Sequence, residues 1–119
     1  MVLETSEVIE AWKEENKNRK YETIERWIQD IDPSKIIAIS QPYEYPEILS
    51  DYKMKNLRKK IKTAKDWDMS PKHALSLCLL KFPNGDMVVD GAGNHRAVLA
   101  KELKVPIIKA TLNEVVYLD

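Results

Sequence analysis

The sequence Asp90-Gly91-Ala92-Gly93-Asn94-His95-Arg96 contains the turn around which the rest of this chain is expected to fold. Before it, Met87-Val88-Val89 has the composition of a short buried strand, and after it small and apolar residues recur at helical spacing. A strand, a glycine turn and a helix N-terminus often bind an anion, because glycine lets the backbone approach the ligand and the first helical N–H groups point at it. The alternative is an ordinary strand-turn-helix corner, in which Asn94 caps the helix and His95 and Arg96 face solvent.

Composition and charge limit the class of protein. The 119 residues are enough for one hydrophobic core, and 44% hydrophobic with 32% charged residues is ordinary for a globular protein. The net charge is zero, so no global field attracts nucleic acid. The single cysteine, Cys78, excludes an internal disulfide and a cysteine-based metal cluster. Since the sequence shows no signal peptide and no long apolar span, we expect a cytoplasmic protein without membrane contact.

The N-terminal quarter of the chain has the spacing of a long helix. Apolar residues recur at helical positions over residues 6–31, so residues 1–31 are predicted as a helical extension of a domain at 32–119. One apolar patch contains Trp12 and a second contains Trp27. Core packing is the expected role of both tryptophans. A helix that binds a protein partner is the alternative.

The remaining pattern predicts an α+β fold, with a small mixed β-sheet flanked by helices. Strands are expected at 35–39, 74–82, 87–90 and 105–110, helices at about 51–65 and 94–103, and a short tail at 111–119. Pro83-Asn84-Gly85-Asp86 carries the Asn-Gly signal of a tight hairpin turn between two of these strands.

The predicted helix at 51–65 has a basic stripe. Lys53, Asn56 and Lys60 fall along one edge of its apolar stripe, because each residue advances about 100° around the helix axis. This position places two ammonium groups and an amide where the helix meets the core, and it favours a rim that faces phosphate. A solvated basic surface is the alternative, and it is what most charge runs are.

Four short motifs occur in an order that is found in a known superfamily. They are Asp32-Pro33-Ser34-Lys35-Ile36, Lys53-x-x-Asn56-Leu57-x-x-Lys60-Ile61, Gly93-Asn94-His95-Arg96 and Val105-Pro106-Ile107. Their order and spacing resemble the ParB/sulfiredoxin-like superfamily, and the similarity to sulfiredoxin extends furthest, over residues 30–115. The resemblance implies a ParB/sulfiredoxin-like fold. It also implies that the matching helix positions and the His95–Arg96 pair bind the phosphates of ATP.

The departures from that pattern argue against two activities of the superfamily. Asn94 stands where sulfiredoxin has its nucleophilic cysteine, and an amide cannot form a thiolate, so no sulfiredoxin activity is expected. Cys78 lies in a different predicted strand and does not replace it. Partition proteins add a helix-turn-helix module for which this sequence leaves no room, so sequence-specific DNA binding is not expected either.

These observations predict a nucleotide- or phosphate-binding domain with a regulatory or accessory function, whose ligand is ATP or another nucleotide. The predicted binding residues are Lys53, Asn56, Lys60, Gly91, Gly93, Asn94, His95 and Arg96. One alternative is a metal-assisted phosphotransferase or nuclease, with Asp90 and His95 as catalytic candidates and Mg2+ held between Asp90 and the phosphates. Another is a protein-interaction or inhibitor module that has kept the fold without binding a ligand.

Overall fold

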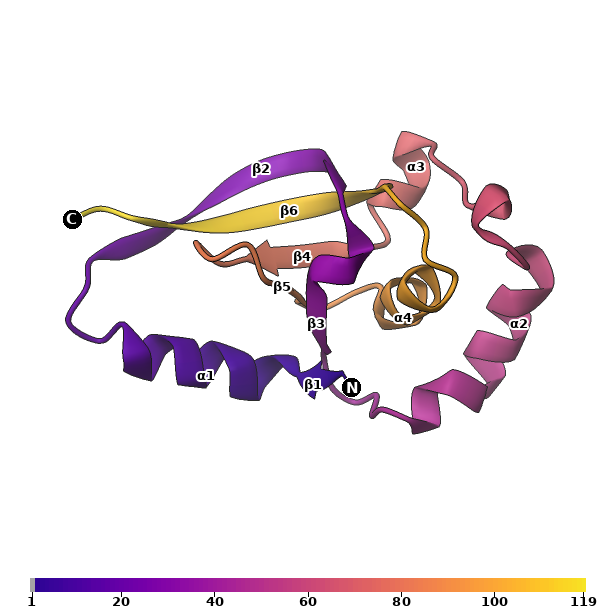
Figure 1. Ribbon diagram of the computed structural model, residues 1–119, viewed down its shortest axis with the longest axis horizontal. Helices are drawn as coiled ribbons and strands as arrows, with labels where there is room; N and C mark the ends of the chain where they lie inside the picture. The colour runs from indigo at the N-terminus through magenta and orange to yellow at the C-terminus, as the bar shows by residue number, and fades with distance from the viewer. Residues whose placement is uncertain (1) are drawn as a thin grey trace.

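The computed structural model describes residues 2–119 as one mixed six-stranded sheet with four α-helices (Figure 1). The strands are β1 (Leu3–Glu4), β2 (Tyr21–Ile31), β3 (Ile36–Ile39), β4 (Cys78–Lys81), β5 (Met87–Val89) and β6 (Ile108–Tyr117). The helices are α1 (Thr5–Glu15), α2 (Tyr52–Lys60), α3 (Pro71–Ala74) and α4 (Asn94–Glu102). The sheet order is β1-β3-β5-β4-β6-β2, with β2–β6 and β4–β5 antiparallel and the other pairs parallel. The predicted α+β class is therefore confirmed.

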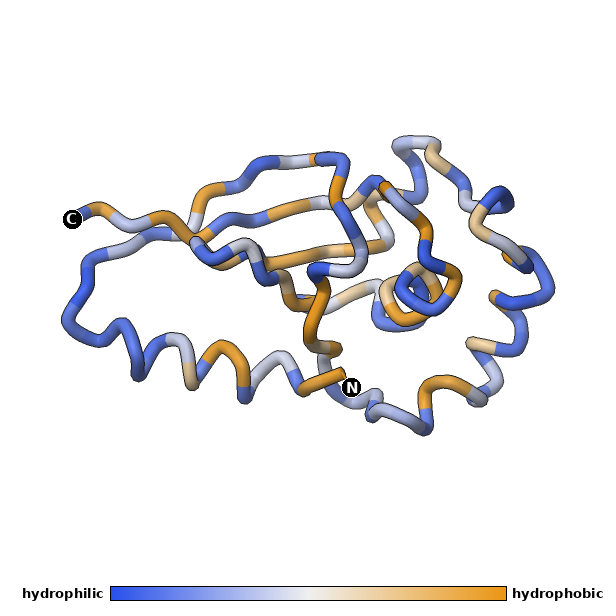
Figure 2. Tube along the Cα trace, viewed as in Figure 1, coloured by the Kyte–Doolittle hydropathy of each residue, from blue (hydrophilic) through white to orange (hydrophobic). Residues whose placement is uncertain are grey.

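Helices cover both faces of the sheet. Successive residues of a strand point to opposite faces, and β4 shows this clearly. Leu79 joins the core with Ile108 beneath α4 and α2, whereas Leu80 joins a second cluster in which Trp12 of α1 lies against Phe82. Figure 2 shows that the trace through β3, near the centre of the molecule, is hydrophobic, and that the loop between α1 and β2 is hydrophilic.

The predicted helix over residues 6–31 is wrong in its second half. α1 ends at Glu15, and residues 21–31 form β2, which pairs with β6 along its whole length. The side chain of Asn16 donates to the backbone carbonyl of Trp12 at 2.8 Å, beside the backbone N–H of the same asparagine at 3.0 Å, and so reinforces the end of the helix. The residues expected as a helical extension thus contribute β1 and β2, which lie at opposite edges of the sheet.

The two tryptophans have different environments. Trp12 lies among the aromatic rings of Tyr21, Phe82 and Tyr117, with ring centroids 4.7 to 6.1 Å apart, so the expectation of core packing is right for this residue. Trp27 is 70% exposed, so the same expectation is wrong there. Trp12 is accordingly part of the packing between α1 and the sheet, although it stays partly exposed.

The other predicted elements differ mainly at their ends. The hairpin at 83–86 forms as predicted, and the N–H of Phe82 donates to the carbonyl of Asp86 at 2.9 Å. β4 begins at Cys78 rather than at residue 74, because Pro71 opens the short helix α3. Residues 111–117, predicted as a tail, instead continue β6 with alternating burial.

Candidate functional site

The first turn of α4 has a glycine as its N-cap. Gly93 has a left-handed backbone (φ 104°) and provides no side-chain cap, so the first N–H groups of the helix have no capping side chain. The glycine is also required by packing, because a Cβ here would lie 2.5 Å from Cδ1 and 2.7 Å from Cα of Leu77. Gly91 is left-handed as well (φ 102°), but nothing lies within 4 Å of a Cβ built on it.

The side chain of Asn94 points away from the turn's surface, so only its backbone can take part in the predicted phosphate site. The residue is only 3% exposed, and its amide faces the end of β3. The N–H of Ser40 donates to Oδ1 at 2.8 Å, and Nδ2 donates to the Ser40 carbonyl at 2.9 Å. The Ser40 hydroxyl donates to the carbonyl of Gly91 at 3.1 Å. These contacts fix the turn to the sheet and leave only the backbone of Asn94 for binding.

His95 is held by the residue that begins α2. Its Nε2 lies 2.8 and 3.0 Å from the two carboxylate oxygens of Asp51, which also accepts from the N–H of Met54 at 2.8 Å and so caps α2. Partial burial would raise the pKa of Asp51. The hydrogen bonds from Met54 and His95, together with the charges of His95 and Lys53, outweigh burial and lower it. Because an ionised carboxylate only accepts, Nε2 is the donor to Asp51, and Nδ1 is the nitrogen left for another partner.

Lys53 reaches the same place through an aromatic ring. Its Nζ donates to the hydroxyl of Tyr43, and the Tyr43 ring meets the His95 ring edge-on with centroids 4.6 Å apart. The hydrogen bond to Tyr43 raises the pKa of Lys53, so the ammonium stays charged at neutral pH. The structure thus brings together two of the predicted residues, Lys53 and His95, with Tyr43 between them.

Arg96 lies on the other side of the same helical turn. Its Nη2 donates to Nδ1 of His73 at 3.2 Å, and Nε2 of His73 lies 2.9 Å from a carboxylate oxygen of Asp68. Because a guanidinium has only donors, Nδ1 of His73 is the acceptor of this hydrogen bond. Burial lowers the pKa of Arg96 and the charge of Asp68 opposes that change, but a guanidinium remains charged in either case.

Three other predicted residues lie apart from this turn. Lys60 is exposed two helical turns after Lys53, which corresponds to about 10 Å along the axis of α2. Asn56 is half-buried between them. Asp90, at the end of β5, lines a separate hollow with Trp27, and neither His95 nor Arg96 is part of that lining. Asp90 and His95 therefore have different surroundings, since His95 contacts Asp51.

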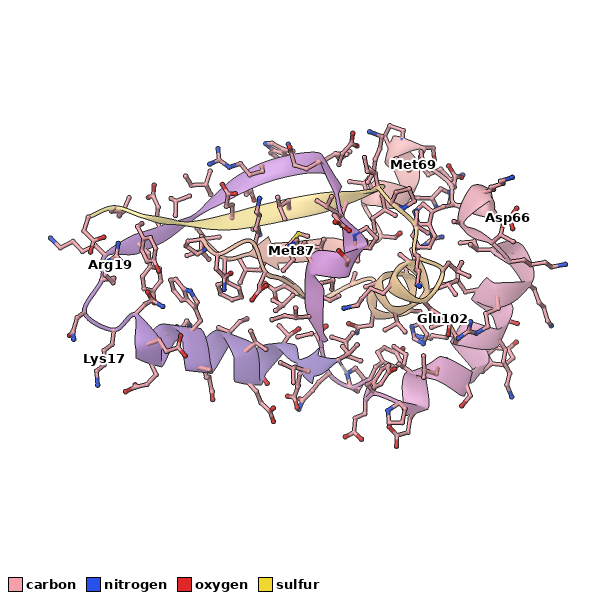
Figure 3. All side chains as sticks on the ribbon, viewed as in Figure 1. Lys17, Arg19, Asp66, Met69, Met87 and Glu102 are labelled. Carbon is pink, nitrogen blue, oxygen red and sulfur yellow. The ribbon has the colours of Figure 1, made fainter. Side chains whose placement is uncertain are left out.

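An ion pair ties α2 to α4 beyond the site. Arg58 binds the carboxylate of Glu102 and also donates to the carbonyl of Leu49 at 3.2 Å. Figure 3 labels Glu102 in the space between these two helices. The pair therefore joins the C-terminal ends of α2 and α4, whereas Asp51 and His95 meet at their N-terminal ends.

Comparison with known proteins found no matching family model, no matching curated protein and no matching solved structure. Within residues 2–119, no three His, Cys, Asp or Glu side chains are arranged to hold a metal ion. Over the same residues, none of the helices has the length and apolar character needed to span a membrane.

Sequence reasoning missed most of the side chains that position the site. Asp51 was recognisable only as the start of a helix, which is a common place for aspartate. Tyr43 occurs in a loop, and the pattern around His73 gives no signal, because its role depends on Asp68 and Arg96 meeting it in space.

Proposed function

We propose that this protein binds a phosphate group, carried by a nucleotide such as ATP, at the first turn of α4. We further propose that it acts as a regulatory or accessory domain rather than as a sulfiredoxin-type enzyme. The observation that carries the proposal is the glycine N-cap, Gly93, which leaves the first turn of α4 without a side-chain cap while cations lie on both sides of that turn. Phosphate is the ligand that such a turn binds most readily.

The pairing of the cations supports the proposal. Arg19, Arg26 and Arg58 each contact a carboxylate directly, and their charge is largely neutralised. Arg96 instead contacts an imidazole and Lys53 a phenol. Within residues 2–119 neither cation forms a direct ion pair, and the nearest carboxylates, Asp68 and Asp51, contact His73 and His95 instead. Both cations therefore keep donors for an anion. A planar guanidinium suits phosphate because it can donate two parallel hydrogen bonds.

The order of sequence motifs is a second support. The segment Gly93-Asn94-His95-Arg96 resembles the turn with which sulfiredoxins bind the phosphates of ATP, and in the structure it does open a helix after a strand. The ParB/sulfiredoxin-like assignment remains part of this proposal. Lys60 is the weakest member of the predicted set because of its distance from the turn.

The test is binding of ATP, CTP, GTP and inorganic phosphate, with and without Mg2+, measured by thermal shift and by calorimetry. Arg96→Ala should weaken binding roughly tenfold or more, because a charge-assisted hydrogen bond contributes about 1.5–3 kcal/mol. Lys53→Ala should act in the same direction. Lys59→Ala, an exposed lysine on the same helix, is the matched control and should bind as the unmodified protein does. If none of the four ligands raises the melting temperature, the site is not a phosphate site, and an interaction module becomes the better account.

The Asp51–His95 pair favours a second candidate, hydrolysis of the bound phosphate ester. A carboxylate that fixes the Nε2 proton leaves Nδ1 able to accept a proton from water. This candidate predicts release of inorganic phosphate from the bound nucleotide, with Mg2+ arriving on the nucleotide. His95→Gln should then abolish release while binding is reduced little. Absence of release from the unmodified protein under saturating nucleotide and Mg2+ would exclude it.

A further inference from the structure

We propose that the hollow beside Trp27 binds the ammonium or guanidinium group of a lysine or arginine side chain in a partner polypeptide. The hollow has a volume of about 120 Å³ and is separate from the first turn of α4. Its lining consists of Glu25, Trp27, Cys78, Leu79, Asp90, Thr111 and Asn113.

The sheet places Glu25, Cys78, Thr111 and Asn113 on the face that carries α1, beyond the part that α1 covers. Cys78 pairs with Thr111, and Glu25 pairs with Asn113, so the four belong to neighbouring rows of the same face. The N–H of Asp90 donates to the carbonyl of Cys78 at 2.9 Å, which brings Asp90 to the end of one row. α1 covers the same face further along, over Leu80, Phe82 and Val115.

The charge of the hollow points to a cation. Two carboxylates, Glu25 and Asp90, line it, and no lysine or arginine does. The nearest cations along these strands, Arg26 of β2 and Lys81 of β4, both form ion pairs with Glu114, which is not part of the lining. Within residues 2–119, neither Glu25 nor Asp90 forms an ion pair, so an arriving cation would meet two unneutralised carboxylates.

Trp27 adds the second element of a cation site. The face of an indole ring attracts a cation through its quadrupole, and tryptophan does so better than tyrosine or phenylalanine. Trp27 lies where the register between β2 and β6 shifts, at a β-bulge, with φ 58° and 70% of its surface exposed. A bulge of this kind re-aims a side chain out of the regular alternation of a strand. The indole is therefore held at the surface beside the two carboxylates.

Size and surroundings decide the class of ligand. Sites for whole small molecules and cofactors occupy about 300–1,000 Å³, so this hollow has room for a single charged head group. Ile28, next to Trp27, is also partly exposed and can contact the aliphatic part of a long side chain. A side chain from a polypeptide meets both requirements, because the remainder of the ligand stays outside the hollow.

The test compares two peptides that differ only in charge. A short capped peptide with one central arginine is titrated into the 15N-labelled protein beside the same peptide with citrulline, which has the same shape without the charge. The Trp27 indole signal is identified by its loss in Trp27→Leu. We expect a saturable shift of that signal with the arginine peptide alone, weakened by salt because the attraction is electrostatic.

Variants and controls make the outcome decisive. Asp90→Asn and Glu25→Gln should each weaken binding by about threefold or more, in line with the loss of an exposed charge contact. Glu22→Gln, on the same strand outside the hollow, should bind unchanged. An equal response to citrulline, unchanged affinity in Asp90→Asn, or no saturable shift would overturn the proposal. If free arginine binds as tightly as the peptide, the site takes a small molecule and the assignment to a polypeptide is wrong.

Discussion

The side chain of Asn94 and the backbone of Ser40 exchange two hydrogen bonds in opposite directions, at 2.8 and 2.9 Å. The pattern is the one that two paired peptide groups form in a sheet, with the amide of Asn94 in place of a second backbone. It connects the end of β3 with the start of α4. A residue that the sequence places in a ligand-binding motif therefore joins two elements of the fold.

Asn94→Asp should destabilise the protein by about 1–3 kcal/mol at neutral pH. The substitution keeps the shape of the side chain but removes the N–H group that donates to the carbonyl of Ser40. That carbonyl then faces a carboxylate oxygen, which cannot donate to it. Urea unfolding measures the change in the free energy of unfolding. Asn18→Asp, in the exposed turn after α1, is the control and should change it by less than about 0.5 kcal/mol. Equal effects of the two substitutions would contradict a structural role for Asn94.

Gly93→Ala and Gly91→Ala form a matched pair, since both glycines have nearly the same left-handed φ. At Gly91 the added methyl group meets nothing within 4 Å, so only the backbone cost applies, which is about 1 kcal/mol. At Gly93 the methyl group would also overlap Leu77 and the carbonyl of Ser76, adding about 1–3 kcal/mol. Denaturant unfolding of both variants should show that Gly93→Ala is clearly the less stable. The reverse order would mean that Ser76 and Leu77, in the loop after α3, move aside at little cost.

Lys104→Gly should stabilise the protein by about 1 kcal/mol. Lys104 follows α4 with φ 55°, and the N–H of Val105 donates to the carbonyl of Ala100 at 3.1 Å, which is the pattern of a helix ending that favours glycine. The control is Lys72→Gly in α3, where the backbone is helical and glycine should destabilise. Thermal and urea unfolding provide the comparison. A loss of stability in Lys104→Gly would mean that contacts of the lysine outweigh its backbone strain.

Acid should weaken the fold partly through Asp51. Its pKa is lowered in the folded protein, so its contribution is fully present above the ordinary aspartate pKa of about 4 and is lost as the pH falls through the lower folded value. Asp51→Asn should therefore be less stable than the unmodified protein at pH 6, and the difference should shrink toward pH 2. Glu10→Gln, on the exposed side of α1, is the control and should follow the unmodified curve. A constant difference at all pH values would show that Asp51 acts only as a helix cap.

The parts of the fold that depend on local sequence were predictable. The Asn84-Gly85 turn and the helix after Gly93 need only the backbone preferences of a few neighbouring residues, and both form. β2 was missed because Ile24, Trp27, Ile28 and Ile31 recur at helical intervals. The bulge at Trp27 disturbs the alternation of two that would have revealed a strand. The signal for a strand was the β-branched and aromatic content of residues 21–31. The residues of β6 have a similar content.

The candidate site was predictable only in outline. The motif named His95 and Arg96, which do lie on the first turn of a helix, but their partners come from segments far away in sequence. Asp51 meets His95 because α2 packs beside α4, and His73 meets Arg96 because α3 precedes β4 at the same end of the sheet. Contacts of this kind follow from tertiary packing, which cannot be read from the spacing of residues in the sequence.

The pairing of β2 with β6 has a consequence for how the chain folds. This ladder is the longest in the sheet, and it joins Tyr21 to Tyr117 and Ile31 to Ile108, so its two strands are far apart in the sequence. A nascent chain emerging from the ribosome must keep residues 21–31 unpaired until residues 108–117 arrive. Contacts between residues so distant in sequence form slowly during folding. Unpaired strand edges that are exposed in the meantime are prone to aggregate. β2 carries charged residues along its length, which would keep the unpaired segment from associating with other chains. They are Glu22, Glu25, Arg26 and Asp30.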